Sequence, residues 1–96
     1  ATIHGCLEDF QTNRLEQVLE RCDASVKAHP NQPGPRSDRA LVHSLRGDRQ
    51  RACADVDEGL KLLARLPSGN DDPLLRQELT VRQAACRQQR TIDASD

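Results

Sequence analysis

The residues best suited to chemistry in this sequence are its four cysteines, Cys6, Cys22, Cys53 and Cys86. A chain of 96 residues buries only about two thirds of its unfolded surface. An even number of cysteines in so small a chain is typical of disulfides that reinforce a thin core, and would place the protein in an oxidising compartment. The alternative is that the cysteines stay reduced and act as small buried apolar residues.

A metal site is the other chemistry open to cysteine. His4 lies two residues before Cys6, and Cys22 follows further along the chain. Tetrahedral zinc sites use more closely spaced pairs of ligands than these. We therefore expect no metal and no other cofactor, with Cys6 in a disulfide or in the core and His4 on the surface.

Motifs that support catalysis do not occur in this sequence. It contains no phosphate-binding glycine loop, nucleophile elbow, CxxC pair or HExxH helix. His43 has no serine or cysteine nearby that suits nucleophilic attack, and we expect it to be a half-exposed packing residue. Asp71 and Asp72 could form a carboxylate pair, but Asp72 is better explained as a helix cap and Asp71 as part of a loop. The sequence thus predicts no catalytic residues and no enzyme activity.

Composition narrows the classes of partner. The formal net charge is −1 and 30% of the residues are charged, so no strong uniform field would attract nucleic acid or an acidic membrane. Phe10 is the single aromatic residue, which leaves no set of rings to stack on bases. No apolar run approaches the roughly 20 residues of a membrane span. With nucleic acid and membranes disfavoured, we expect the partner to be another protein.

Arginines gather in two groups, which consist of Arg46, Arg49 and Arg51, and of Arg82, Arg87 and Arg90. Acidic residues close to the first group can neutralise it; these are Asp48, Asp55, Asp57 and Glu58. Both groups therefore fit a solvated surface. Recognition of an acidic peptide is the functional alternative.

The elements that must position these residues are helices. Leu, Ala, Arg, Gln and Glu dominate over β-branched and aromatic residues, which favours helix over strand. Apolar residues recur at helical spacing between breaks at residues 29–35, 47–48 and 67–70. The sequence therefore predicts an all-α fold with five helices. They cover about residues 3–10, 13–28, 35 to the Gly47-Asp48 turn, that turn to 66, and 72–90.

Small residues at Ala40, Ala52 and Gly59, with the Gly47-Asp48 turn between the first two, resemble a tetratricopeptide repeat. In that family the small positions let two antiparallel helices approach each other. One period of about 34 residues earlier, the corresponding positions hold Cys6, Val18 and Ser25, and Pro30 stands where the family's closing proline falls. The chain departs from the family pattern where large apolar residues or a tyrosine are usual, and the residues there are Arg36, Arg39 and His43; Pro67 also comes late.

The resemblance implies a single domain over residues 1–96 with two disulfides. Its parts would be repeat one at about residues 1–32, repeat two at about 33–66, a capping helix at about 72–90 and a frayed tail at 91–96. Stacked repeats usually need about three units to bury a continuous core, so disulfides would have to compensate. The pairing implied by the repeats, which is similar to secreted bacterial members, is Cys6–Cys22 and Cys53–Cys86.

In this family the first helices line a concave surface that holds a peptide or a partner helix. On that mapping the candidate partner-binding residues are Ile3, Leu7, Phe10, Ser37, Leu41, Ser44 and Leu45. The alternative is that Leu7, Phe10 and Leu45 belong to the core. These positions lack the Lys and Asn with which some members bind a terminal carboxylate, so the implied partner is an apolar or amphipathic segment. A second copy of the chain could equally cover the surface.

Two hypotheses for the function follow. The first is a periplasmic or secreted adaptor or scaffold that binds a protein of an envelope or secretion assembly. The second is a small periplasmic inhibitor or immunity protein that blocks a toxin or an enzyme by covering its active site. The chain begins at Ala1 without methionine, as expected after removal of a signal peptide, although a shortened chain would look the same.

Overall fold

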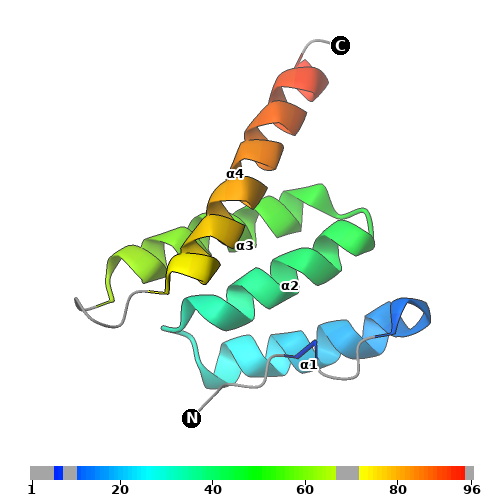
Figure 1. Ribbon diagram of the computed structural model, residues 1–96. Coiled ribbons are helices and arrows are strands. Elements are labelled where there is room, and N and C mark those ends of the chain that lie inside the picture. Colours follow the sequence, from blue (N-terminus) through cyan, green and yellow to red (C-terminus); the bar gives the residue numbers. More distant parts are fainter. Residues whose placement is uncertain (1–5, 8–10, 67–71, 95–96) are drawn as a thin grey trace.

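The computed structural model describes residues 6–7, 11–66 and 72–94, and their regular structure is helical (Figure 1). A short 3-10 helix, η1 (Thr12–Arg14), leads into the first α-helix. The α-helices are α1 (Leu15–Ala28), α2 (Pro33–Leu45), α3 (Arg49–Ala64) and α4 (Pro73–Ala94). The predicted all-α fold is confirmed.

The predicted number of helices was wrong, because the described residues form four α-helices rather than five. Of the helix expected at residues 3–10, only Cys6 and Leu7 are described, and they lie in a turn. The other residues of that prediction lie outside the described residues. At the other end of the chain, α4 continues to Ala94, past the predicted end near Arg90.

Local sequence signals set the ends of the helices. Asp48 accepts a hydrogen bond from the backbone N–H of Arg51 at 3.2 Å, and Asp72 accepts one from that of Leu75 at 3.1 Å. Gly47 adopts a φ of 80°, a left-handed backbone that favours glycine and lets α2 turn directly into α3. The predicted cap at Asp72 and the turn between the two helices are confirmed.

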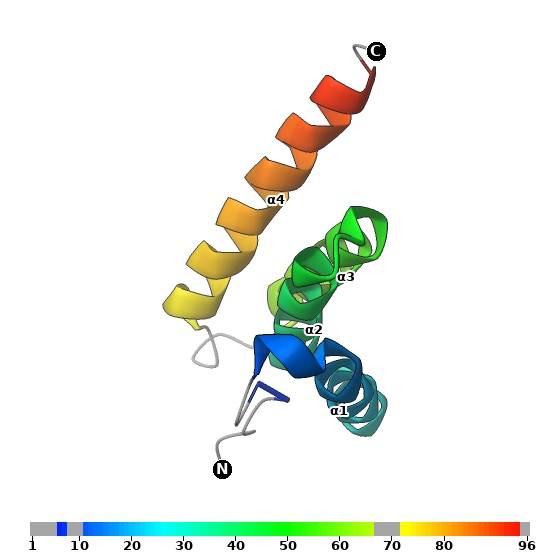
Figure 2. The ribbon, with the colours of Figure 1, turned by 90° about the vertical axis from the view of Figure 1, so that its right-hand side faces the viewer.

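Helices α1, α2 and α3 lie side by side and alternate in direction, whereas α4 leans away from them (Figures 1 and 2). The first half of α4 packs against α2 and α3, and its second half projects beyond them. The arrangement leaves one side of the α2–α3 hairpin uncovered where α4 diverges.

Two apolar clusters hold these elements together. The first joins the N-terminal turn, α1 and α2 through Cys6, Val18, Cys22 and Val42. The second joins α2, α3 and α4 through Ala40, Val56, Leu63 and Leu79. A Cβ atom added to Gly59 would lie 3.2 Å from Cδ2 of Leu79 and 3.4 Å from Cδ1. The close approach of α4 to α3 therefore depends on the missing side chain at residue 59.

Two disulfides reinforce the same contacts. Cys6–Cys22 fixes the N-terminal turn to α1, and Cys53–Cys86 fixes α4 to α3. These are the pairs that the resemblance implied. The bonded cysteines are 16 and 33 residues apart. Loops of these lengths restrict the unfolded chain enough to stabilise the fold by about 3 and about 4 kcal/mol.

Candidate partner-binding cleft

A cleft of about 240 Å³ opens where α4 diverges from the α2–α3 hairpin. Its walls come from the end of α2, the first half of α3 and the middle of α4. The lining residues are Ser44, Arg49, Ala52, Cys53, Val56, Arg82, Ala85 and Cys86. Because Ala52 and Ala85 are small, α3 and α4 leave space between them although a disulfide joins the two helices. We call this space the α3–α4 cleft.

The floor of the α3–α4 cleft is apolar and held in place. Ala52 and Val56 are buried in α3, and Val56 also belongs to the second core cluster. The disulfide Cys53–Cys86 ties the two walls together. A preformed apolar depression of this kind can accept an apolar side chain without reorganising the protein.

Both charged residues that line the cleft are arginines. Nη1 of Arg82 donates hydrogen bonds to the carbonyl oxygen of Ser37 at 2.8 Å and to its Oγ at 2.6 Å. Nη2 of Arg82 lies 3.4 Å from Oε1 of Glu78. Arg49, the first residue of α3, is exposed, and it has no ion-pair partner among the described residues. The cleft therefore combines an apolar floor with a cationic rim.

The two serines predicted to bind a partner have different surroundings. Ser44 is exposed and lines the α3–α4 cleft. Ser37 has an exposed fraction of 1%, and its hydroxyl accepts the hydrogen bond from Arg82. Ser37 thus lies in the contact between α2 and α4 and not on an open surface, because α4 covers this part of α2.

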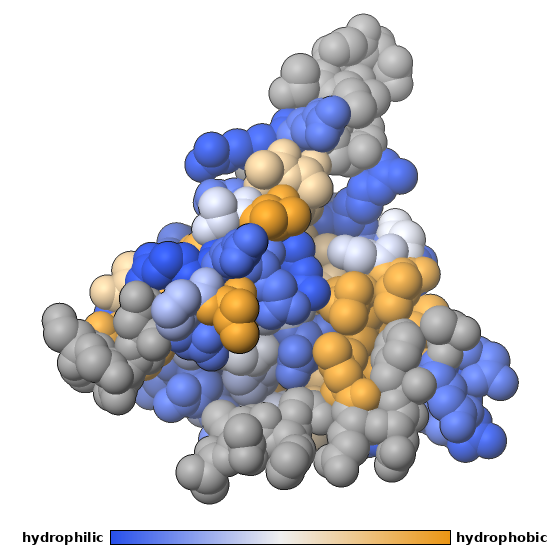
Figure 3. All heavy atoms as spheres, in the orientation of Figure 1, coloured by the Kyte–Doolittle hydropathy of each residue, from blue (hydrophilic) through white to orange (hydrophobic). Residues whose placement is uncertain are grey.

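The predicted apolar residues that the structure describes are not among those that line the cleft. Leu45 is exposed, Leu41 is half-buried, and Leu7 packs against the first core cluster. Ile3 and Phe10 lie outside the described residues. In Figure 3, apolar side chains gather at the right of the molecule near the α2–α3 turn, and smaller apolar spots occur along α4. The seven predicted residues therefore do not form one continuous site in the described part of the chain.

The sequence mapping missed the α3 and α4 walls of the cleft. It assigned Ala52 to helix packing and Arg82 to a solvated group of arginines, and it gave Ala85 no role. The one signal available was the group of arginines on the last helix. The direction in which α4 leans is set by packing at Gly59 and the nearby disulfide, and helical periodicity does not reveal it.

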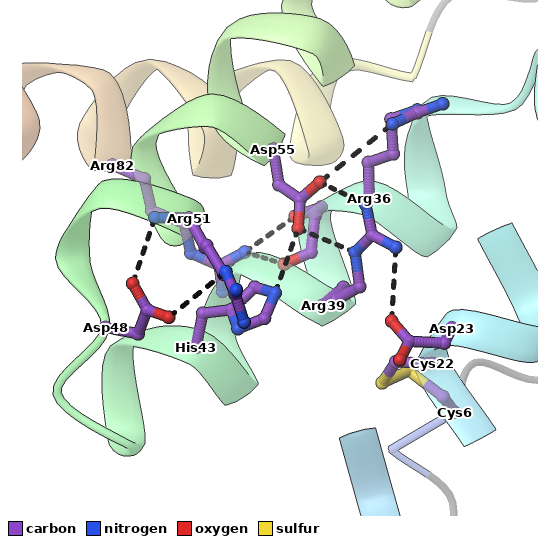
Figure 4. Close-up of polar contacts among 11 residues, drawn as sticks. Cys6, Cys22, Asp23, Arg36, Arg39, His43, Asp48, Arg51, Asp55 and Arg82 are labelled. Atoms are coloured by element: carbon purple, nitrogen blue, oxygen red, sulfur yellow. Dashed lines mark hydrogen bonds and ion pairs between the residues drawn. A yellow bond between two sulfur atoms is a disulfide. The ribbon is translucent and has the colours of Figure 1, made fainter. Parts of the chain in front are cut away.

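A separate polar network surrounds the buried carboxylate of Asp55 (Figure 4). Arg39 donates from Nε to Oδ2 at 2.8 Å and from Nη2 to Oδ1 at 2.7 Å. Nε2 of His43 lies 3.7 Å from Oδ2, and Nη1 of Arg36 lies 3.9 Å from Oδ1. Arg39 also reaches Oδ1 of Asp23 in α1 at 3.2 Å. The network connects α1, α2 and α3.

The chemistry of this network is that of a structural ion cluster. The hydrogen bond to Asp55 raises the pKa of Arg39 above its ordinary value and outweighs the opposing effect of burial. Nδ1 of His43 and Nε of Arg36 are buried without a hydrogen-bond partner. A second cleft, of about 330 Å³, lies beside the network, and no serine, threonine or cysteine is among its described lining residues. We therefore find no nucleophile beside His43 on this side of the described structure.

Two expectations about these residues were wrong. His43 is buried, with an exposed fraction of 5%, because its ring points toward Asp55 and α3 and not toward solvent. Asp55 does not neutralise the arginines around the Gly47 turn, because it faces α2 and is occupied by Arg39. One of those arginines, Arg46, instead pairs with Glu16 in α1, with Nη2 and Oε1 2.6 Å apart.

The other candidate ligands and catalytic residues give no second site. All four cysteines form disulfides. Within the described residues, no group of three or more His, Cys, Asp or Glu side chains is arranged to hold a metal ion. His4 and Asp71 lie outside the described residues. The same part of the chain contains no helix that is long and apolar enough to cross a membrane.

The α3–α4 cleft is thus open, apolar at its floor and fixed by covalent and packing contacts. The functional interpretation depends on this geometry. Comparisons with protein-family models, with curated proteins and with solved structures found no match for this chain.

Proposed function

We propose that this chain is a protein-interaction module similar to tetratricopeptide-repeat proteins, an adaptor or scaffold that holds an apolar or amphipathic segment of another protein. The observation that carries the proposal is the preformed α3–α4 cleft, which opens to solvent above a floor of buried apolar side chains. Its walls are fixed by Cys53–Cys86 and by the contact of Gly59 with Leu79.

The size of the cleft supports a protein partner. Pockets that hold small molecules usually measure about 300–1,000 Å³, whereas this cleft measures about 240 Å³. A space of that size suits one or two apolar side chains of a larger partner. Protein interfaces commonly derive most of their affinity from a few such anchoring side chains in well-packed pockets.

The helix contacts support the repeat-like assignment. Ala40 and Ala52 are buried, and Gly59 of α3 faces Leu79 of α4. These are the positions at which a tetratricopeptide repeat needs small residues. In this proposal α2 and α3 form one helix pair and α4 takes the place of the capping helix.

The two disulfides support a periplasmic or secreted location, because disulfides persist in oxidising compartments and are rare in the cytosol. In that compartment the partner would be a protein of an envelope or secretion assembly. The inhibitor or immunity function is kept as an outcome of the test, because an inhibitor would use the same kind of open surface.

Affinity capture with matched tryptophan variants tests the proposal. Ala84 and Ala85 are adjacent and exposed in α4, but only Ala85 lines the cleft. We expect the wild type and Ala84→Trp to retain a discrete protein from an envelope extract of the source organism, and Ala85→Trp to lose it. Circular dichroism must show equal helicity for all three chains.

The possible results separate clearly. If Ala85→Trp retains the protein as well as Ala84→Trp does, the cleft is not the binding surface. If the retained protein is a toxin or enzyme whose activity the chain abolishes, the function is inhibition. If the wild type retains nothing, the interaction proposal fails.

A further inference from the structure

We infer that the segment bound in the α3–α4 cleft is acidic as well as apolar, with one apolar side chain in the cleft and a nearby carboxylate on Arg49. This inference rests on the proposed function and specifies the chemistry of the partner. It concerns charges that the cleft presents at its rim, and it would not follow from the overall charge of the chain, which is −1.

The lining of the cleft is positively charged. Arg49 and Arg82 contribute two cations, and none of the lining residues in the described structure is acidic. Arg82 already uses Nη1 to bind Ser37, which fixes its guanidinium at the rim. Arg49 is exposed and has no ion-pair partner among the described residues. Arg82 also pairs with Glu78 through Nη2, so Arg49 is the cation that a carboxylate brought to the cleft would meet.

The apolar floor strengthens this preference. Charges interact more strongly beside a surface that excludes water, because the effective dielectric constant falls there. A guanidinium also binds a carboxylate through two parallel hydrogen bonds, which adds geometric selectivity. An acidic amphipathic segment would thus gain from both the apolar floor and Arg49, whereas Arg49 would repel a basic one.

The first experiment selects peptides from a random display library on the wild-type chain, with Ala85→Trp as the subtraction target. We expect the enriched peptides to combine a large apolar residue with Asp or Glu. On Arg49→Glu the acidic residues should no longer be enriched, and Lys or Arg should replace them. Arg65→Glu is the matched control, because Arg65 is exposed beyond the last residue of α3, outside the cleft.

The second experiment measures binding by fluorescence anisotropy for one enriched peptide and for a copy in which glutamine replaces its glutamate. On the wild type we expect about ten-fold weaker binding of the glutamine copy, as for the loss of one charge-assisted hydrogen bond. On Arg49→Gln the two peptides should bind equally. Added salt should weaken binding of the acidic peptide to the wild type.

The outcomes distinguish this inference from the proposed function. If no peptide is enriched on the wild type over Ala85→Trp, both fail. If enriched peptides depend on Ala85 but carry no acidic residue, or if the glutamine copy binds as well as the original, only the acidic partner is excluded. If sedimentation shows a wild-type dimer that Ala85→Trp converts to a monomer, the occupant is a second copy and the inference is overturned.

Discussion

Both carboxylate oxygens of Asp55 accept hydrogen bonds from Arg39, at 2.7 and 2.8 Å, across the contact between α2 and α3. Asp55 has an exposed fraction of 4%, so its charge would be costly without a partner. Arg36 and His43 face the same carboxylate. Three of the positions at which the sequence departs from the tetratricopeptide pattern therefore take part in one ion network.

Removing the buried charge should destabilise the fold strongly. We expect Asp55→Asn to lower the free energy of unfolding by about 3 kcal/mol, because Arg39 then loses its buried partner. The matched control is Asp23→Asn, which removes the exposed partner of the same arginine and should cost less than about 1 kcal/mol. Urea denaturation of both variants measures the difference. Equal costs would show that Asp55 has no special role in stability.

The contact between Gly59 and Leu79 should tolerate no larger side chain. We expect Gly59→Leu to destabilise the chain by about 2 kcal/mol or more, since the added atoms would overpack a buried contact. Gly34 also lies in a helix but has no neighbouring atom within 4 Å of an added Cβ, so Gly34→Leu should change stability by less than about 0.5 kcal/mol. Thermal unfolding of the two variants provides the comparison. If Gly59→Leu costs no more stability than Gly34→Leu, packing against Leu79 does not explain the glycine at residue 59.

The features that the sequence predicted well depend on local signals. The cap at Asp72 and the turn at Gly47 follow from residue types that have one preferred use at a helix end. The disulfide pairs followed from the resemblance, which placed Cys6 and Cys22 on the paired helices of repeat one and let Cys53 and Cys86 join repeat two to the capping helix. The helix predicted at residues 3–10 rested on an apolar face, and at Cys6 and Leu7, the two of these residues that are described, the chain forms a turn.

The features that the sequence did not predict depend on tertiary geometry. Asp55 lies between Ala52 and Val56, so its place on an inner helix face could have been read from the periodicity. A charged residue there was instead assigned to the surface, which is its more common location. The α3–α4 cleft depends on the lean of α4, and no residue spacing encodes that angle.

The two disulfides should differ in their rates of reduction. Cys86 is only half-buried and lines the open cleft together with Cys53, whereas Cys6 and Cys22 are both buried in the first core cluster. A reductant must reach a sulfur atom to attack it, so Cys53–Cys86 should be reduced first. Alkylation at timed intervals with peptide mass spectrometry measures the order. Faster reduction of Cys6–Cys22 would show that the N-terminal turn opens more readily than the cleft exposes its disulfide.

Asp38 of α2 should make the stability of the fold depend on pH. Burial raises its pKa from 3.8 to about 6, the nearby carboxylate of Glu78 adds to the rise, and Arg82 opposes it. The folded chain therefore binds a proton at Asp38 more tightly than the unfolded chain does. The contribution of Asp38 to the free energy of unfolding therefore rises as the pH falls from about 6 toward 3.8. That contribution is lost as the pH rises through about 6.

Asp38→Asn removes this titration and should stabilise the chain where the wild-type carboxylate is charged. We expect a gain of about 1 kcal/mol near pH 7, a modest value because solvent screens a part-buried group. The gain should shrink toward zero near about pH 4, where the wild-type carboxyl group is protonated in the folded state. Urea denaturation of both chains across this range measures the gain. A gain that stayed constant with pH would mean that shape or hydrogen bonding, and not the charge of Asp38, separates the two chains.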